Sequence, residues 1–152
     1  MKWSFLLMVA LMLGCMQRET RDDGALARET FTEQAAKGRQ IFADSCSRCH
    51  GDQGEGTKKA PRLIGSSEGA LPLNPPRDGK ERRGQFHTAQ DVGMYALEYM
   101  PPLETGSLTE AAYWRITAYL LQQNGIDLGN QHLDRSVART VALPRPSLTT
   151  QR

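Results

Sequence analysis

The sequence predicts an all-α fold, with three or more main helices joined by long loops. Three segments carry apolar residues at the spacing of amphipathic helices, at 32–45, 89–99 and 110–123. The stretches between them are rich in glycine and proline and show no regular period. The chain has 152 residues, which suits one domain with tails.

The first helix is expected from about Thr32 to Ser45. Thr30 and Glu33 stand three residues apart, in the pattern of a capping box that marks a helix start. Small and apolar residues recur at helical spacing and continue into a cysteine: Ala35, Gly38, Ile41, Phe42 and Cys46.

Two further helices follow, each preceded by a threonine cap. Thr88 precedes a helix over 89–99, which ends at a Met-Pro-Pro sequence because proline cannot continue it. Thr109 precedes a helix over 110–123, which ends at an Asn-Gly pair. The expected inward-facing residues are Val92, Tyr95 or Ala96, and Tyr99 in the second helix, and Tyr113, Ile116, Tyr119 and Leu120 in the third.

The N-terminus has the features of an export signal. The apolar run Trp3–Leu13 follows a lysine and is far shorter than the ~20 residues that span a bilayer. It leads into Gly14-Cys15, which resembles the signal of bacterial lipoproteins, whose cysteine becomes the N-terminus and carries lipid. An ordinary secretory signal cut elsewhere is the alternative. We therefore expect a signal peptide over 1–14, a lipid anchor on Cys15, and a protein on the periplasmic side of a membrane.

The rest of the chain divides into a tether, a domain and a tail. Residues 15–30 are charged and poor in large apolar residues, which is typical of a flexible tether. The domain is expected over 31–127. A loosely ordered tail is expected over 128–152, because no strong period is present there. Lys and Arg total 19 against 17 Asp and Glu and form no block, so composition gives no indication of nucleic-acid binding.

One short motif carries the strongest chemical signal. Cys46-Ser47-Arg48-Cys49-His50 is the C-x-x-C-H pattern of covalent c-type haem attachment, which chance would produce in about one such chain per thousand. Two thiols three residues apart in a helical turn can each bond one haem vinyl group, and the adjacent imidazole then lies beneath the iron as proximal ligand. Cys46, Cys49 and His50 are therefore the candidate haem-binding residues.

Four other interpretations of these cysteines have less support. A thioredoxin-like redox pair needs a βαβ unit, and no β-branched runs flank this motif. A zinc site would also need two of the three histidines, which do not form a second closely spaced pair. An iron–sulfur cluster needs four thiolates, and the chain has three cysteines. A plain disulfide between Cys46 and Cys49 would leave His50 without a role.

Over 31–127 the chain resembles the small single-haem class I cytochromes c, although the segment 66–86 does not align with them. The resemblance implies the cytochrome c fold, in which helices surround one covalently attached haem c. It rests on an ordered set of motifs: Gly38-x-x-x-Phe42-x-x-x-Cys46-x-x-Cys49-His50-Gly51, Gly54-x-Gly56, Pro61-x-Leu63-x-Gly65, Met100-Pro101, and Leu108-Thr109 ahead of Ile116-x-x-Tyr119-Leu120.

The resemblance also implies roles for individual residues. The carbonyl of Pro61 is expected to accept a hydrogen bond from Nδ1 of His50, which fixes the ring and its basicity. Leu63 is expected to contact the haem. The N- and C-terminal helices are expected to cross closely at Gly38, where the packing partners are Phe42, Ile116 and Tyr119.

Met100 is the candidate for the sixth ligand of the iron. A thioether just after a helix, followed by two prolines that stiffen the loop, can be held against the iron, and its soft sulfur stabilises the ferrous state. The alternative for any methionine is core packing, which is the expected role of Met94. His87 and His132 could ligate instead, but they stand in polar surroundings typical of solvated histidines.

These features predict an electron carrier and not an enzyme. Single electrons would pass between protein redox partners outside the cytoplasmic membrane, through the exposed haem edge. The alternative is a dedicated electron-acceptor subunit of a periplasmic dehydrogenase or other oxidoreductase complex, docked through the segment from Ile126 onward. A gas-binding or catalytic haem protein with an open iron site is a third class. Lys58, Lys59 and Arg62 are either a surface that steers an acidic partner or ordinary solvated loop charge.

Overall fold

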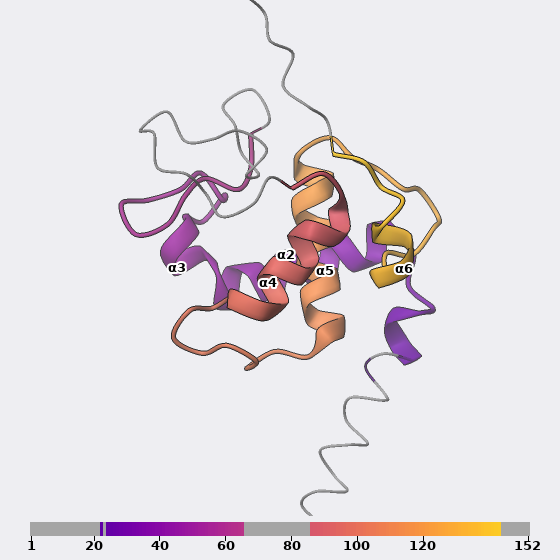
Figure 1. Cartoon of the computed structure of the whole chain (residues 1–152), viewed down its shortest axis with the longest axis horizontal. Coiled ribbons are helices and arrows are strands. Elements are labelled where there is room, and N and C mark those ends of the chain that lie inside the picture. The colour runs from indigo at the N-terminus through magenta and orange to yellow at the C-terminus, as the bar shows by residue number, and fades with distance from the viewer. Residues whose placement is uncertain (1–21, 23, 66–85, 144–152) are drawn as a thin grey trace, which may run out of the picture.

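The computed structural model describes residues 22, 24–65 and 86–143. It confirms the all-α prediction, because these residues contain no strand beyond one isolated β-bridge, between Thr88 and Ala142. No helix among them is long and apolar enough to cross a membrane. The predicted signal peptide, Cys15, residues 66–85 and the last residues of the tail, 144–152, lie outside the described residues. The helices are α2 (Phe31–Ser45), α3 (Ser47–His50), α4 (Ala89–Tyr99), α5 (Glu110–Gln123) and α6 (Arg135–Ala138) (Figure 1).

Side-chain caps set where the three long helices begin. At the start of α2, the Thr30 hydroxyl accepts a hydrogen bond from the Glu33 N–H, and the Glu33 carboxylate accepts one from the Thr30 N–H at 2.8 Å. Thr88 and Asp91 form the same reciprocal pair at the start of α4, and the Thr109 hydroxyl caps α5. The caps are confirmed. The bounds of α4 and α5 match those predicted, and α2 begins one residue earlier than expected.

α5 is the central helix of the fold, and α2 and α4 both pack against it (Figure 1). Its side chains from Ala111 to Leu121 are all buried. Where α2 crosses α5, Gly38 lies against the backbone of Arg115 and leaves no room for a side chain. One turn further along each helix, the rings of Phe42 and Tyr119 pack with their centroids 5.4 Å apart. The close crossing that the sequence implies is therefore confirmed.

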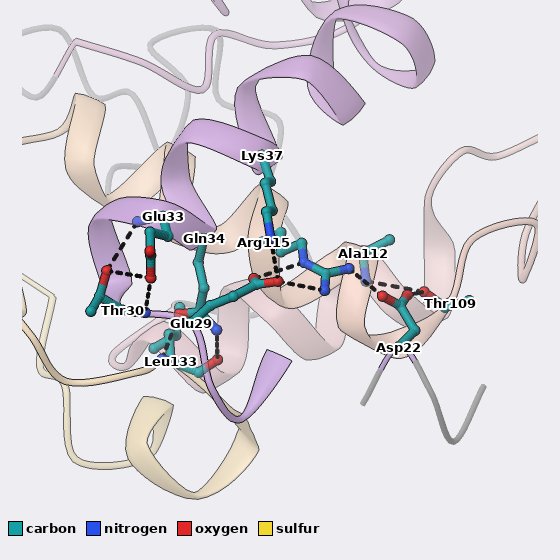
Figure 2. Close-up of polar contacts among 10 residues, drawn as sticks. All are labelled: Asp22, Glu29, Thr30, Glu33, Gln34, Lys37, Thr109, Ala112, Arg115 and Leu133. Carbon is teal, nitrogen blue, oxygen red and sulfur yellow. Dashed lines mark hydrogen bonds and ion pairs between the residues drawn. The ribbon is translucent and has the colours of Figure 1, made fainter. Parts of the chain in front are cut away.

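The segment before α2 is part of the domain, so the expectation of a flexible tether up to residue 30 is wrong for its second half. Leu26 is buried in the core, and Glu29 is 7% exposed. Figure 2 shows the Arg115 guanidinium between two acidic side chains of this segment, Glu29 at 2.9 Å and Asp22 at 2.5 Å. Lys37 from α2 also contacts Glu29, at 2.8 Å. Asp22 and Glu29, whose charges suggest a solvated tether in the sequence, are paired in the fold.

Much of the predicted tail is also packed, and the domain does not end at residue 127. Leu133 and Ala138 are fully buried and Leu143 nearly so. The Gln34 amide of α2 donates to the Leu133 carbonyl at 3.0 Å and accepts from the Leu133 N–H at 2.7 Å (Figure 2). Because a buried amide satisfied on both sides fixes this backbone, residues up to 143 belong to the domain.

The aromatic residues on α4 do not all face inward. Val92 is buried, and of the pair Tyr95 or Ala96 it is Ala96 that faces inward, at the cavity. Tyr95 is 38% and Tyr99 is 49% exposed, so the expectation that Tyr99 faces inward is wrong. The ring of Tyr95 packs between those of Phe86 and Tyr99, with centroid distances of 5.3 and 5.0 Å. Stacking at the surface replaces burial for these side chains. Trp114, on α5, is buried.

Candidate functional site

One apolar cavity lies where the end of α2, α3, the end of α4 and the middle of α5 meet. The cavity itself has a volume of about 70 Å³, which is below the ~300–1,000 Å³ of typical cofactor sites. Phe42, Leu108, Ile116 and Leu120 form much of its apolar wall. The structure brings five of the predicted haem-binding residues to this wall: Cys46, Cys49, His50, Leu63 and Met100.

The two cysteines flank a single helical turn. The N–H groups of Cys49 and His50 donate to the Cys46 carbonyl at 3.1 and 3.0 Å, so both thiols and the imidazole project from one turn of backbone beside the cavity. Both thiols are free. Burial, with a smaller contribution from Cys49, raises the pKa of the Cys46 thiol from 9.0 to about 11. At neutral pH this thiol is therefore protonated.

A hydrogen bond between the His50 ring and Pro61 decides which ring nitrogen keeps its lone pair. Nδ1 lies 2.8 Å from the carbonyl oxygen of Pro61. Because a carbonyl can only accept, Nδ1 carries the proton and donates, which leaves the lone pair on Nε2. The chain can turn back to this position because Gly51, directly after the imidazole, takes a φ of 88° that disfavours other residues. The structure thus contains the hydrogen bond that the resemblance implies.

Asn124 holds the loop that carries Pro61 and Leu63, a role that the sequence analysis did not assign to it. Its side-chain amide donates to the Leu63 carbonyl at 2.9 Å and to the Leu120 carbonyl at 2.7 Å. Its side-chain oxygen accepts from the Gly65 N–H at 3.1 Å. A polar residue at a helix end predicts a cap, but its contact with a loop about sixty residues away depends on the tertiary fold.

Among the described candidates for the sixth ligand, Met100 alone lines the cavity. It is the C-cap of α4, and its N–H donates to the Ala96 carbonyl at 2.9 Å. Met94 is partly buried against the core, as expected. His87 is exposed, and Nε2 of His132 lies 3.0 Å from the Asp134 carboxylate, in a different surface groove.

The residues around the cavity fit a covalently attached haem. They provide two free thiols and a histidine in one turn, an imidazole whose Nε2 keeps its lone pair, and a thioether from another element. In the described part of the chain, no group of three or more His, Cys, Asp and Glu side chains is placed to hold a bare metal ion.

The basic residues of the adjacent loop are open to solvent. Lys58 and Lys59 are exposed, as are Asp52 and Glu55 in the same loop. Arg62 is half-buried, and its guanidinium reaches the Ile64 carbonyl at 3.5 Å. The loop therefore offers two exposed lysines beside the cavity residues, with acidic neighbours that weaken their field.

Comparisons with known proteins identify the family of this chain. Residues 35–124 match the cytochrome c family. The thiosulfate dehydrogenase of Stutzerimonas stutzeri (strain A1501) is 34% identical over 88 residues, which cover 56% of this chain and 26% of that protein. The crystal structure of the sulfane dehydrogenase SoxCD from Paracoccus pantotrophus matches with a TM-score of 0.56 and 33% identity, over 72% of this chain and 53% of that one. The chain thus spans about a quarter and about half of these relatives.

Proposed function

Because the chain belongs to the cytochrome c family and carries its covalently bound haem c, we propose that it passes single electrons between extracytoplasmic redox partners through one haem. The observation that carries this proposal is the convergence of Cys46, Cys49, His50 and Met100 on one apolar cavity. Bound there, the haem stores one electron by cycling its iron between the ferric and ferrous states.

The residues of the chain hold the cofactor and limit structural change during electron transfer. Cys46 and Cys49 would hold the haem through two thioether bonds, and Nε2 of His50 would bind its iron. The Pro61 carbonyl, by accepting from Nδ1, orients the imidazole and raises its basicity. The apolar wall excludes water, so little solvent has to reorganise when the charge of the site changes.

Met100 is the proposed sixth ligand. Its place on the cavity wall, at the end of a helix and before two prolines, supports this role, and the alternatives His87, His132 and Met94 lie elsewhere. A thioether favours ferrous iron and gives a higher reduction potential than a second nitrogen ligand. With His50 and Met100 both holding the iron, no site would be left for a substrate or a gas, and the protein would act as a carrier.

We also propose that the protein is exported and anchored to a membrane. The signal-like segment 1–14 and Cys15 support a lipid-anchored protein on the periplasmic side. Lys58 and Lys59, exposed beside the cavity residues, support an acidic protein partner.

A second candidate function is a dedicated electron-acceptor subunit of a dehydrogenase complex. Two relatives are dehydrogenases by name and longer than the matched region, which favours a cytochrome working beside a catalytic unit. The segment from Ile126 onward is not a free docking arm up to residue 143, because it packs on the domain itself. A partner would therefore dock on the folded surface.

Paired methionine variants test the proposed function. In a potentiometric titration of the exported holoprotein, one electron should be transferred per chain. Met100→Ala should lower the potential and remove the thioether-to-iron absorption of the ferric form, because ferrous iron loses its soft ligand. Met94→Leu should leave potential and absorption unchanged and alter stability by less than ~1.5 kcal/mol. A wild-type potential that Met100→Ala does not move would contradict the ligation.

A further inference from the structure

We infer that Tyr113 is a positioning residue, whose hydroxyl fixes the loop that carries Met100 and so keeps the thioether at the cavity. This inference rests on the proposed ligation by Met100 and names the group that maintains it. Tyr113 lies on the central helix α5, is 3% exposed, and itself lines the cavity.

The hydroxyl joins the loop to the core. It donates to the carbonyl oxygen of Met100 at 2.5 Å, the first residue after α4. Because a carbonyl oxygen can only accept, the phenol is the donor in this bond.

The loop has few other means of being held. Pro101 and Pro102 have no N–H to donate, and Leu103 is 97% exposed. The hydrogen bonds within the loop are local, from Glu104 to the Pro101 carbonyl at 3.0 Å and from Ser107 to the Glu104 carbonyl at 3.1 Å. By contrast, Tyr113 lies in the part of α5 whose residues, Ala111 to Leu121, are all buried. The Tyr113 hydroxyl on α5 therefore ties this loop to the core.

Loss of the hydroxyl should shift the balance between bound and detached Met100. The Met100 carbonyl loses its partner, and the loop loses its fixed point. Removal of one such hydrogen bond changes a local equilibrium by about 5- to 30-fold. The detached state leaves the iron open, so the rate of carbon monoxide binding to the ferrous protein should increase by about that factor.

The test compares two conservative variants of the exported holoprotein. Tyr113→Phe keeps the ring and removes only the hydroxyl. Tyr119→Phe is the matched control, because Tyr119 is a buried tyrosine on the same helix that packs on Phe42 and makes no hydroxyl hydrogen bond within the described residues. We expect Tyr113→Phe alone to bind carbon monoxide faster, to weaken the thioether-to-iron absorption and to lower the reduction potential. A merely structural role would lower the melting temperature and leave these three properties unchanged.

The experiment distinguishes a wrong role for Tyr113 from a wrong ligation by Met100. One outcome is that the wild type binds carbon monoxide slowly, Met100→Ala binds it rapidly, and Tyr113→Phe binds it at a rate within twofold of the wild type. In that case the role of Tyr113 is wrong and the ligation by Met100 stands. If the wild type binds carbon monoxide as fast as Met100→Ala, the ligation itself is wrong, and the inference falls with it.

Discussion

A Cβ atom on Gly38 would overlap the carbonyl oxygen of Arg115, so α2 and α5 touch backbone to backbone at this point. From the same residue, the Arg115 side chain extends to Glu29 and Asp22 of the segment before α2 (Figure 2). The crossing that brings both helices to the cavity is therefore joined to the ion pairs that hold the N-terminal segment.

We expect Gly38→Ala to destabilise the domain by about 1–3 kcal/mol or more, because the added methyl group meets backbone atoms that cannot rotate away. Urea unfolding of the holoprotein measures the loss. Gly24→Ala is the control, since a Cβ there meets nothing within 4 Å, and it should be neutral or stabilising by up to ~1 kcal/mol. Equal effects of the two substitutions would show that the crossing has room for a side chain.

The ion pair of Glu29 should make stability depend on pH. Burial raises the pKa of Glu29, but hydrogen bonds and charge from Arg115 and Lys37 outweigh it, so the pKa lies below its ordinary value of 4.5. A carboxylate with a lowered pKa in the folded state adds stability above its unfolded pKa and loses it as the pH falls through the folded value.

Glu29→Gln should therefore cost about 1.5–3 kcal/mol near neutral pH, and the difference from the wild type should shrink as the pH falls below 4.5. Denaturant unfolding across this pH range measures the loss of stability near neutral pH and its decrease in acid. Glu98→Gln, at an exposed position on α4, is the control and should change stability by less than ~0.5 kcal/mol. A Glu29→Gln difference that stays constant down to about pH 2 would rule out the titration of this pair.

Asn124→Ala should loosen the loop that positions His50. The substitution leaves the Leu63 carbonyl and the Gly65 N–H without their side-chain partner, at a cost of about 2 kcal/mol. Amide exchange at Gly65 should increase by about tenfold or more. Asn130→Ala, at an exposed turn, should change neither stability nor exchange. Unchanged exchange at Gly65 in Asn124→Ala would remove Asn124 from the architecture of the site.

The start of each long helix can be predicted from the sequence because the signals are local. Thr30 and Glu33 cap each other within one turn, and Thr88 and Thr109 act in the same way. The packing of the N-terminal segment and of the tail cannot be predicted in this way. Glu29 and Arg115 are 86 positions apart in the sequence, and Gln34 and Leu133 are 99 positions apart. Only the tertiary fold brings these pairs together.

The residues of the site likewise differ in whether the sequence alone predicts them. The C-x-x-C-H motif and the Met-Pro sequence indicate residues that line the cavity, since haem chemistry restricts their type and spacing. Asn124 and Tyr113 act through hydrogen bonds to backbone carbonyls, which any residue provides, so no sequence pattern marks their partners. The lipid anchor on Cys15 and the signal peptide stay predictions.

Haem attachment and lipid attachment should depend on different cysteines. Cys46→Ala and Cys49→Ala should each leave a single thioether bond, and the double variant should lose its haem to acid–acetone extraction. Cys15→Ser is the control: it should keep haem through two thioethers but no longer incorporate labelled fatty acid or remain with membranes. Haem that stays with the double variant would refute attachment through this motif, and fatty acid in Cys15→Ser would refute the anchor.

The claim that this chain is an electron carrier depends most directly on whether its iron is closed on both sides. The decisive measurement is the absorption spectrum of the unmutated, reduced holoprotein before and after addition of carbon monoxide. With His50 and Met100 both bound, the spectrum should stay unchanged over minutes, while Met100→Ala should change at once. Rapid carbon monoxide binding by the unmutated protein would show an open iron site and contradict the carrier account in favour of a gas-binding one.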